Sequence, residues 1–425
     1  MSAANAPSAS PKEERFKYTN LGPVFFGLLV AAGVGSLVCI ISIFVPNHAF
    51  GISDRMEHGK LVYGPHSQFL FSWLFAFMFF FTISAGSLFW TMLHYAVDAE
   101  WSVVVRRILE TMANSFRWLW LAFIPIAFWA PTIYRWMDTV AFHEHVDPAL
   151  DGKRPMLNSH VWAIFTVLIF AFFFTASYTL RWLSVRQDKD GDPSCTTKSR
   201  KVAFFSIPLF AIMLTAGAIF WAMSIQWHWY STMWGVYIFA GSAWSSMATL
   251  IIITYLLRSA GYLEGVVSTE HFHIMGKLLL SFTVFWAYIS FSQFFLIWYA
   301  NIPEETEYFL IRNTESWNTW AIGFQVVGHF FITFAVLCPR ITKTNMKYLA
   351  WIAGWVLLMH AADMYFIVSP FLHPKGVAPL TMIVDLAALA AIGAPLAIVF
   401  IRALGRHSLY ALRDPRLPES LRLVN

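Results

Sequence analysis

Ten apolar runs account for most of this 425-residue chain, and each run is long enough to cross a lipid bilayer. A membrane-spanning helix needs about 20 mostly apolar residues, and only 12% of the chain is Asp, Glu, Lys or Arg. No segment shows the alternation expected of an outer-membrane barrel strand. The sequence therefore predicts an all-α integral membrane protein with ten transmembrane helices. The predicted spans are residues 21–45, 68–95, 112–133, 158–183, 202–224, 232–257, 277–300, 317–338, 347–369 and 379–404.

The distribution of basic residues predicts the orientation. Of the 29 Lys and Arg residues, 21 lie on the side of the two termini, seven lie on the opposite side, and Arg117 lies within a span. Cytoplasmic connections carry an excess of Lys and Arg. We therefore expect a multi-pass protein of the bacterial inner membrane with both termini in the cytoplasm. The net charge of +5 follows from this bias and does not indicate nucleic-acid binding.

The two ends of the chain have polar compositions. Residues 1–20 begin with Ser, Ala, Pro and charged residues, which predicts a disordered cytoplasmic tail. The first apolar run is long enough to remain a span, so we expect no signal peptide. Residues 405–425 are polar and basic, and we expect a cytoplasmic C-terminal tail.

A short string of small residues occurs twice. The second span contains Ala85-Gly86-Ser87 and the sixth contains Ala240-Gly241-Ser242. Each span is followed by two helices joined by an acidic, aromatic outer loop, and then by a fourth helix. This order predicts two parallel four-helix bundles, residues 68–224 and 232–369, flanked by the first and tenth spans. Small residues also let membrane helices pack closely for other reasons, so the repeat is a hypothesis.

Ionisable residues at bilayer depth are costly and often mark a proton, ion or ligand path. The eighth span carries Gln325 and His329, and the ninth carries His360 and Asp363 at a similar depth. A neutral His exchanges protons near neutral pH, and an Asp one turn away can fix its tautomer or hold a proton. The alternative is a His satisfied by a helix carbonyl or hydroxyl. The same predicted proton pathway includes Lys277, Tyr288 and Ser292 on the seventh span and Asp385 on the tenth.

Two further polar stripes run in from the cytoplasmic side of the second and third spans. Their residues recur at helical spacing and so share one helix face. The alternatives are hydroxyls that bond their own helix carbonyls and an interfacial Arg106–Glu110 ion pair. The predicted entrance consists of Ser84, Ser87, Thr91 and His94 on the second span and Glu110, Asn114 and Arg117 on the third.

Metal and haem sites have weak support in the sequence. His329 and His360 could ligate one b-type haem, but the two His per helix of two-haem cytochromes are absent. The outer-loop segment 143–147 (HEHVD) could bind a metal but is more typical of a solvated loop. The chain has no CxxC or CxxCH motif. We expect no metal and no tightly bound cofactor.

Several longer motifs resemble a known family. They resemble the ActF family, the second ten-helix membrane subunits of alternative complex III, within the polysulfide-reductase membrane-subunit (NrfD-like) family. Together they cover about a fifth of the chain, and the span count extends the resemblance over nearly all of it. The motifs are HWYSTMWGVY (228–237), FAGS (239–242), GKL (276–278), FTVFWAY (282–288), QFFLIWYANIPEE (293–305), DPRL (414–417) and ESL (419–421).

The resemblance implies a subunit of a respiratory quinol:cytochrome c or quinol:oxidase-linked oxidoreductase complex. It implies a subunit without a redox centre of its own, which contributes a proton pathway and a candidate quinone pocket, with menaquinone as the quinone. The implied partners are a sister ten-helix membrane subunit, a molybdopterin-like iron–sulfur subunit, c-type cytochrome subunits and a haem-copper oxidase. The alternatives are a secondary transporter, whose repeats are often inverted, and a purely structural anchor.

A quinone pocket needs an apolar slot, aromatic walls and a few groups that hydrogen-bond the ring oxygens. The outer end of the first predicted bundle has residues of these types. Trp and Tyr at this level are also normal for the membrane interface. The candidate residues are His66, Gln68, Trp73, Tyr134, Arg135, Asp138 and His160.

Overall fold

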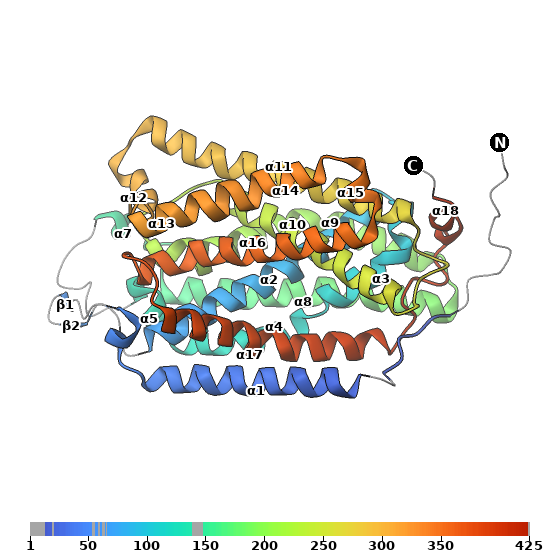
Figure 1. Ribbon diagram of the computed structural model, residues 1–425, viewed down its shortest axis with the longest axis horizontal. Helices are drawn as coiled ribbons and strands as arrows, with labels where there is room; N and C mark the ends of the chain where they lie inside the picture. Colours follow the sequence, from blue (N-terminus) through green and yellow to red (C-terminus); the bar gives the residue numbers. More distant parts are fainter. Residues whose placement is uncertain are drawn as a thin grey trace.

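The computed structural model describes residues 13–18, 21–52, 56–57, 60–61, 64, 66–137 and 148–423, and within them it shows a long helical bundle (Figure 1). Nine helices in these ranges are long and apolar enough to cross a membrane. The chain is therefore an all-helical, multi-pass membrane protein, as the sequence predicts. The nine are α1 (Gly22–Phe44), α2 (Ser67–Ala96), α8 (Ser159–Asp190), α9 with η4 and η5 (Ser194–Gln226), α10 (Trp234–Ser259), α11 (Thr269–Ala300), α13 with η6 and α14 (Glu315–Leu337), α16 (Met346–Leu372) and α17 (Pro379–Leu404).

The third predicted span, residues 112–133, is not one continuous helix. It forms α4 (Phe116–Phe128) and the single turn α5 (Ala130–Ile133), separated at Trp129. Pro125 lies inside α4 and a second Pro opens α5, and a proline removes a helix hydrogen bond and crowds the preceding turn. The helix α3 (Val103–Ala113) precedes them. Each piece is shorter than a bilayer, so the described residues contain nine long helices where ten were predicted.

Short elements connect the long helices. A two-stranded antiparallel pair follows α1, and single turns or short helices lie in the other connections. Two segments of the long helices, η4 and η6, are π-helical. The short elements are η1 (Asn47–Phe50), β1 (Met56–Glu57), β2 (Lys60–Leu61), η2 (Glu100–Ser102), η3 (Arg135–Met137), α7 (Pro148–Lys153), α12 (Pro303–Ile311), α15 (Arg340–Thr344) and α18 (Leu417–Leu421).

The helices α2 and α10 form the centre of the bundle and are its most buried long helices. The two repeated small-residue strings meet there, because a Cβ placed on Gly86 would lie 1.9 Å from the backbone oxygen of Ser242. Only a glycine permits this approach of two helix backbones. The peripheral helix α1 approaches α17 in the same way, since a Cβ on Gly35 would lie 2.6 Å from the Ala387 oxygen.

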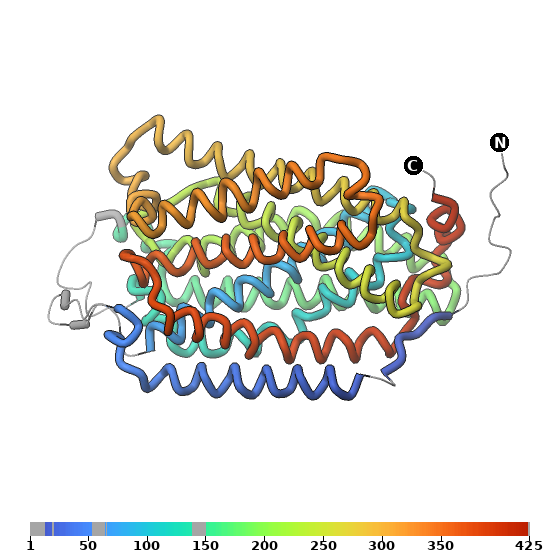
Figure 2. Tube along the Cα trace, in the orientation of Figure 1, coloured from blue at the N-terminus to red at the C-terminus, as the bar shows by residue number. Residues whose placement is uncertain are grey.

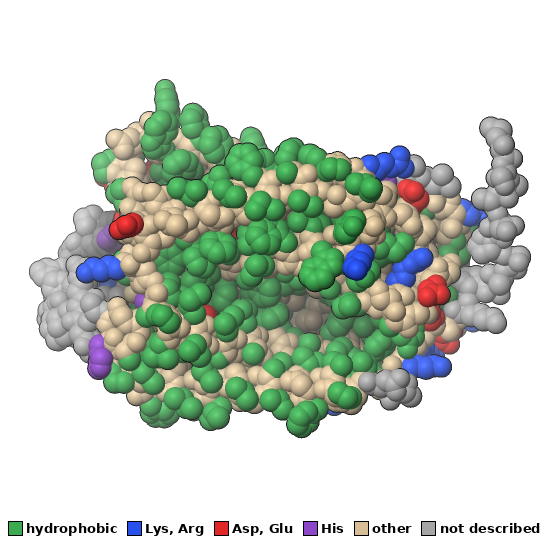
Figure 3. Space-filling model, in the orientation of Figure 1, with side chains coloured by type: hydrophobic (Ala, Val, Ile, Leu, Met, Phe, Trp, Pro, Cys, Tyr) green, Lys and Arg blue, Asp and Glu red, His purple; other side chains and the backbone are tan. Residues whose placement is uncertain are grey.

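The described parts of the two chain ends meet at one end of the bundle (Figure 2). The backbone oxygen of Glu14 accepts a hydrogen bond from Leu409 N, and its carboxylate accepts two from Leu263 N. The segment after α17 packs onto the bundle, with Leu409 and Tyr410 fully buried. Figure 3 shows hydrophobic side chains along the middle of the molecule and charged side chains towards its two ends. The apolar belt has the composition of a lipid-facing surface.

Candidate functional site

Asp363 is the centre of the candidate site. It lies on α16, is completely buried, and accepts hydrogen bonds at Oδ1 from the Tyr237 hydroxyl of α10 and from Gln325 Nε2, the latter at 2.9 Å. The indole of Trp286 on α11 also interacts with this carboxyl group. Four helices of the second predicted bundle therefore meet at one carboxyl group. A buried carboxyl group with several donors can exist as a carboxylate or hold a proton.

His360 lies one turn before Asp363 on α16 and is also completely buried. Its Nε2 lies 2.8 Å from the Thr82 hydroxyl of α2, which itself donates to backbone carbonyls of its own helix. The hydroxyl hydrogen is thus in use, so Nε2 carries the proton that it donates to Thr82. The other nitrogen, Nδ1, then has a lone pair and no hydrogen-bond partner among the described residues.

Gly241 provides the space for this pair. A Cβ at Gly241 would lie 3.2 Å from His360 Cε1, 3.4 Å from its Nδ1 and 4.0 Å from Asp363 Oδ2. The small-residue string of α10 therefore faces the two titratable groups of α16. The sequence marks this glycine as a packing residue, and the structure shows that it also borders the site.

His329 lies between two indole rings. Its ring centroid is 3.9 Å from that of Trp244 and 3.4 Å from that of Trp286, and both pairs are nearly parallel. Neither ring nitrogen has a hydrogen-bond partner among the described residues. Within the described residues, no hydrogen bond connects His329 to His360 or Asp363. The three predicted relay residues therefore lie in adjoining helices without a continuous chain of hydrogen bonds.

Gln325 and His329 belong to η6 (Ala321–Ile332), a π-helical stretch of twelve residues. Such segments are rare, are commonly a single turn, and frequently mark functional sites. Trp355 Nε1 donates to the Gly328 oxygen at 3.0 Å, and the Thr333 hydroxyl donates to the same oxygen at 3.1 Å. These two side chains supply hydrogen bonds to one buried carbonyl of the π-helical stretch. The π-helical turn lets Gln325 reach Asp363 while His329 inserts between the two tryptophans.

A large cavity adjoins this cluster between α11 and η6. Its volume is about 1060 Å³. Its walls include Tyr237 and Gln325, both partners of Asp363, and the Trp286 ring that stacks on His329. The residues at its rim are exposed on the apolar surface, among them Tyr288 of the predicted pathway. The cavity therefore connects the lipid-facing surface with the hydrogen-bond donors of Asp363.

Asp385 belongs to a separate chain of hydrogen bonds at the end of the bundle opposite the termini. His373 Nε2 lies 2.8 Å from Gln68 Oε1, Gln68 Nε2 donates to the Ser72 hydroxyl at 2.8 Å, and that hydroxyl donates to Asp385 Oδ1 at 2.5 Å. His373 directly follows α16, and burial lowers its pKa to about 4, so its ring is neutral near pH 7. Every bond of the chain then donates towards Asp385. An amide lies in the middle, so the chain orients the carboxyl group better than it relays protons.

The stripe on α2 is mostly satisfied by its own helix. The hydroxyls of Ser84, Ser87 and Thr91 each donate to a carbonyl one turn earlier, at 2.7 to 2.9 Å. His94 is buried against the Trp101 ring, and neither of its nitrogens has a hydrogen-bond partner among the described residues. The three hydroxyls therefore bond carbonyls of their own helix, as the alternative to a proton pathway predicts. His94 is the one polar side chain of this stripe without a hydrogen bond among the described residues.

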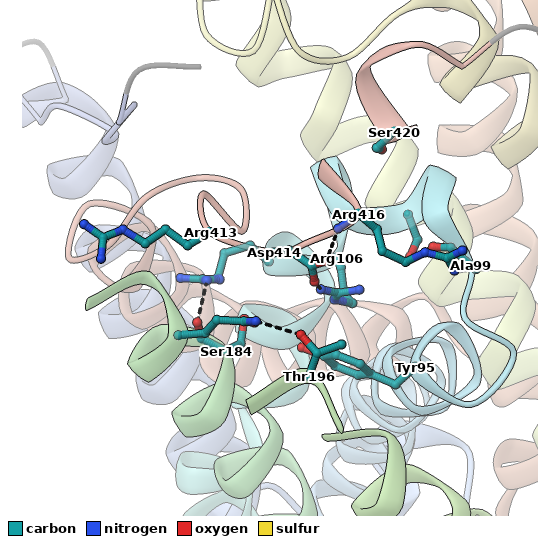
Figure 4. A network of polar contacts seen from close by, with 12 residues as sticks. Tyr95, Ala99, Arg106, Ser184, Thr196, Arg413, Asp414, Arg416 and Ser420 are labelled. Atoms are coloured by element: carbon teal, nitrogen blue, oxygen red, sulfur yellow. Dashed lines mark hydrogen bonds and ion pairs between the residues drawn. The ribbon is translucent and has the colours of Figure 1, made fainter. Parts of the chain in front are cut away.

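The residues of the third-span stripe lie on α3, at its C-cap Asn114 and, for Arg117, in the first turn of α4. Arg106 pairs with Asp414 of the C-terminal segment (Figure 4). Its Nε also lies 3.7 Å from Glu110 Oε1. Glu110 also contacts Arg107 at 3.3 Å. All four side chains are buried. The expected Arg106–Glu110 pair is present, and the partner that the sequence did not predict is Asp414.

The remaining stripe residues occupy different surroundings. Asn114 caps α3 and its Oδ1 is buried, whereas Arg117 is exposed with its guanidinium 5.8 Å from the Tyr178 ring. On α11, Lys277 is exposed and Ser292 is half-buried. Hydrogen bonds do not gather these residues around Asp363.

The predicted quinone-pocket residues have separate roles in the structure. Trp73 donates to the Ala122 oxygen and Tyr134 to the Trp221 oxygen, which fixes both side chains to neighbouring helices. His66 faces the Trp129 ring, Arg135 is half-buried, and His160 is exposed. Gln68 joins the Asp385 chain. Asp138 and the 143–147 segment lie outside the described residues, and none of the six predicted pocket residues that the structure describes lines the cavity beside Asp363.

Comparison with known proteins adds no assignment. No family model matches the sequence, and none of the curated proteins matches it. Within the described ranges, no group of three His, Cys, Asp or Glu side chains is arranged to hold a metal ion. The resemblance to the ActF family stays a prediction.

Proposed function

We propose that this chain is a cofactor-free, proton-conducting membrane subunit of a quinol-oxidising respiratory complex. The observation that carries the proposal is Asp363, a completely buried carboxyl group held by Tyr237 and Gln325 one turn from His360. Burying such a group costs several kcal/mol when it is charged. A scaffold helix gains nothing from it, whereas a proton pathway requires a group that takes up and releases protons.

The proton-carrying steps follow from the hydrogen bonds. A proton that arrives at His360 Nδ1 gives an imidazolium that still donates its Nε2 hydrogen to Thr82, and Nδ1 releases the proton again, because the Thr82 hydroxyl donates only to carbonyls of its own helix. Asp363 accepts a proton while Tyr237 and Gln325 continue to donate to Oδ1, so both protonation states keep these partners. His329 and the stripes on α2 and α3 would extend the route towards the cytoplasm.

We propose ten membrane crossings with both termini in the cytoplasm of a bacterium. The pair α4–α5 provides the additional crossing, because it leads from Asn114 near the chain termini to Tyr134, which binds the Trp221 oxygen at the other end. Its outward residues, including Trp118 and Phe128, are exposed apolar side chains. An even number of crossings agrees with the meeting of both chain ends at one end of the bundle. The two parallel four-helix bundles belong to the same proposal.

The proposed partners are those of the resemblance: a sister ten-helix subunit, a molybdopterin-like iron–sulfur subunit, c-type cytochromes and a haem-copper oxidase. Purification through a tag on this chain in mild detergent, followed by mass spectrometry, tests them. Recovery of the iron–sulfur and cytochrome subunits supports the respiratory complex. Recovery of the chain alone, with substrate flux in liposomes, favours the secondary transporter.

The decisive variant is Asp363→Asn in the purified assembly reconstituted into liposomes. The amide keeps the size of the side chain but cannot take up a proton, so we expect quinol-driven proton uptake to fall at least tenfold while the assembly stays intact. Asp190→Asn is the control, because Asp190 is an exposed carboxylate paired with Arg186 at 2.9 Å. If proton uptake is unchanged in the Asp363→Asn variant, Asp363 does not carry protons, and the proposed function that rests on it is wrong.

A further inference from the structure

The cavity between α11 and η6 has polar groups that the protein does not satisfy. Gln293 of α11 lines it, is 7% exposed, and neither atom of its amide has a hydrogen-bond partner among the described residues. The Oε1 of Gln325 and the indole nitrogen of Trp234 line the same cavity and also have no hydrogen-bond partner among the described residues. An unpaired buried amide costs about 1–3 kcal/mol. Three such groups around one space indicate a ligand that hydrogen-bonds them.

The walls determine the shape of that ligand. The cavity of about 1060 Å³ is at the upper limit of small-molecule sites. Trp234 and Tyr237 stack at 6° to each other, with ring centroids 5.2 Å apart, and form a flat aromatic wall. The rim residues Phe291 and Trp298 are 65% and 64% exposed on the apolar surface. A flat, hydrogen-bonding ring thus fits the inner part, and an apolar tail can leave towards lipid.

The positive charge of a buried arginine in the cavity wall favours a ligand whose oxygen atoms carry partial negative charge. Arg312 lines the cavity and is 5% exposed. Its nitrogens donate to the backbone oxygens of Tyr308, Phe366 and Ile367, and no carboxylate pairs with it within the described residues. Its guanidinium lies 3.5 Å from the Tyr308 ring centroid. The positive charge of Arg312 is therefore available to polarise a carbonyl oxygen in the cavity.

We propose that this cavity, between α11 and η6, binds the ring of an isoprenoid quinone, with Gln293 as a hydrogen-bonding partner of a ring oxygen. A phospholipid acyl chain would fill the apolar part but leave the Gln293 amide and Gln325 Oε1 unpaired. A ring oxygen can accept from Gln293 Nε2, and in the quinol form a ring hydroxyl can donate to Gln325 Oε1. The choice of a quinone as ligand class rests on the proposed function. The location differs from the pocket predicted at the outer end of the first bundle, and it places the ring beside the donors of Asp363.

Photolabelling of the purified assembly tests the site directly. A short-tailed azido-naphthoquinone is added, the sample is irradiated, and the labelled peptides are identified by mass spectrometry. We expect label in the cavity-facing peptides 284–298 and 318–331, and displacement by excess unmodified naphthoquinone. Gln293→Leu should weaken the competition by about 3- to 10-fold, the value of one neutral hydrogen bond.

Gln226→Leu is the matched control. Gln226 is also buried with both amide atoms unpartnered among the described residues, but it lies in η5 and does not line this cavity. Ala287→Trp is a second variant that fills the cavity from α11 without removing a polar group, and it should abolish the label. Both leucine variants replace an unpaired amide by an apolar group, so each should fold at least as stably as the parent chain.

Three results would overturn the inference: label outside these peptides, label that Gln293→Leu and Ala287→Trp leave unchanged, or label by a photoreactive fatty acid that naphthoquinone does not displace. The proton assay separates this outcome from the proposed function. If the cavity does not bind quinone but Asp363→Asn abolishes proton uptake, only the site is wrong. If the cavity binds quinone and Asp363→Asn takes up protons normally, the proton pathway is wrong.

Discussion

The close approach of α2 and α10 at Gly86 allows us to predict how much stability a larger residue at this position would cost. Replacing Gly86 by Ala adds a Cβ that would lie 1.9 Å from the Ser242 oxygen, whereas ordinary contact begins at 3.4 Å. The two backbones must therefore separate by about 1.5 Å. A gap of 0.5–1 Å already forfeits about a quarter to a half of a dispersion contact, and this pair forms the centre of the bundle. We expect a loss of about 3 kcal/mol or more, at the upper end of the cost of overpacking.

The assay is thermal unfolding of the purified protein in detergent, followed by tryptophan fluorescence. A loss of this size should lower the apparent melting temperature by roughly 3 °C or more, because the entropy of unfolding grows with chain length. Gly354→Ala on α16 is the control, because a Cβ there meets nothing within 4 Å. If the two variants melt at the same temperature, the helix backbones are not in contact at Gly86 and the central packing described above is wrong.

Three further predictions concern individual contacts. Gly241→Ala should shift His360, whose Cε1 would lie 3.2 Å from the new Cβ, and lower proton uptake with a smaller loss of melting temperature than Gly86→Ala; equal losses of stability would contradict this. Asp414→Asn leaves the buried Arg106 without its closest carboxylate and should cost about 3 kcal/mol in unfolding experiments, whereas the exposed pair removed by Glu419→Gln should cost under about 1 kcal/mol. The pKa of His373 is about 4 when folded and about 6.5 when unfolded, so the unfolded chain binds the additional proton and stability falls as the pH drops from 6.5 to 4. His373→Gln should flatten this part of the pH profile of melting temperature, and an unchanged slope would show that His373 is not buried.

The long helices could be predicted from hydropathy because a bilayer fixes their length and polarity. The predicted tenth span, 379–404, coincides with α17, and the predicted second span, 68–95, lies within one residue of α2 at each end. The exception was residues 112–133, where Pro125 and the proline that opens α5 interrupt an apolar run. Hydropathy measures only the apolar character of a window, so it does not detect a break that prolines introduce inside it.

The candidate site could be predicted only in part. Asp363 and His360 are conspicuous because ionisable residues at bilayer depth are rare. Tyr237, Gln293 and Arg312 were missed as site residues, because aromatic and amide residues in spans, and a cation near a loop, are individually ordinary. These residues matter because all three line one cavity. The shape of that cavity depends on the π-helical stretch η6, for which the sequence offers no recognised signal.

The two small-residue strings also relate the halves of the site to each other. Thr82 precedes Gly86 by four positions, and Tyr237 precedes Gly241 by four, so each hydroxyl lies one turn from its glycine on the same helix face. Thr82 contacts His360 and Tyr237 contacts Asp363. Equivalent positions of α2 and α10 thus present hydroxyls to successive turns of α16. A duplicated four-helix unit would give this arrangement if the close packing of its first helices arose before the site. The glycines hold α2 and α10 together, and the residues one turn away on each helix then face the same neighbour, α16.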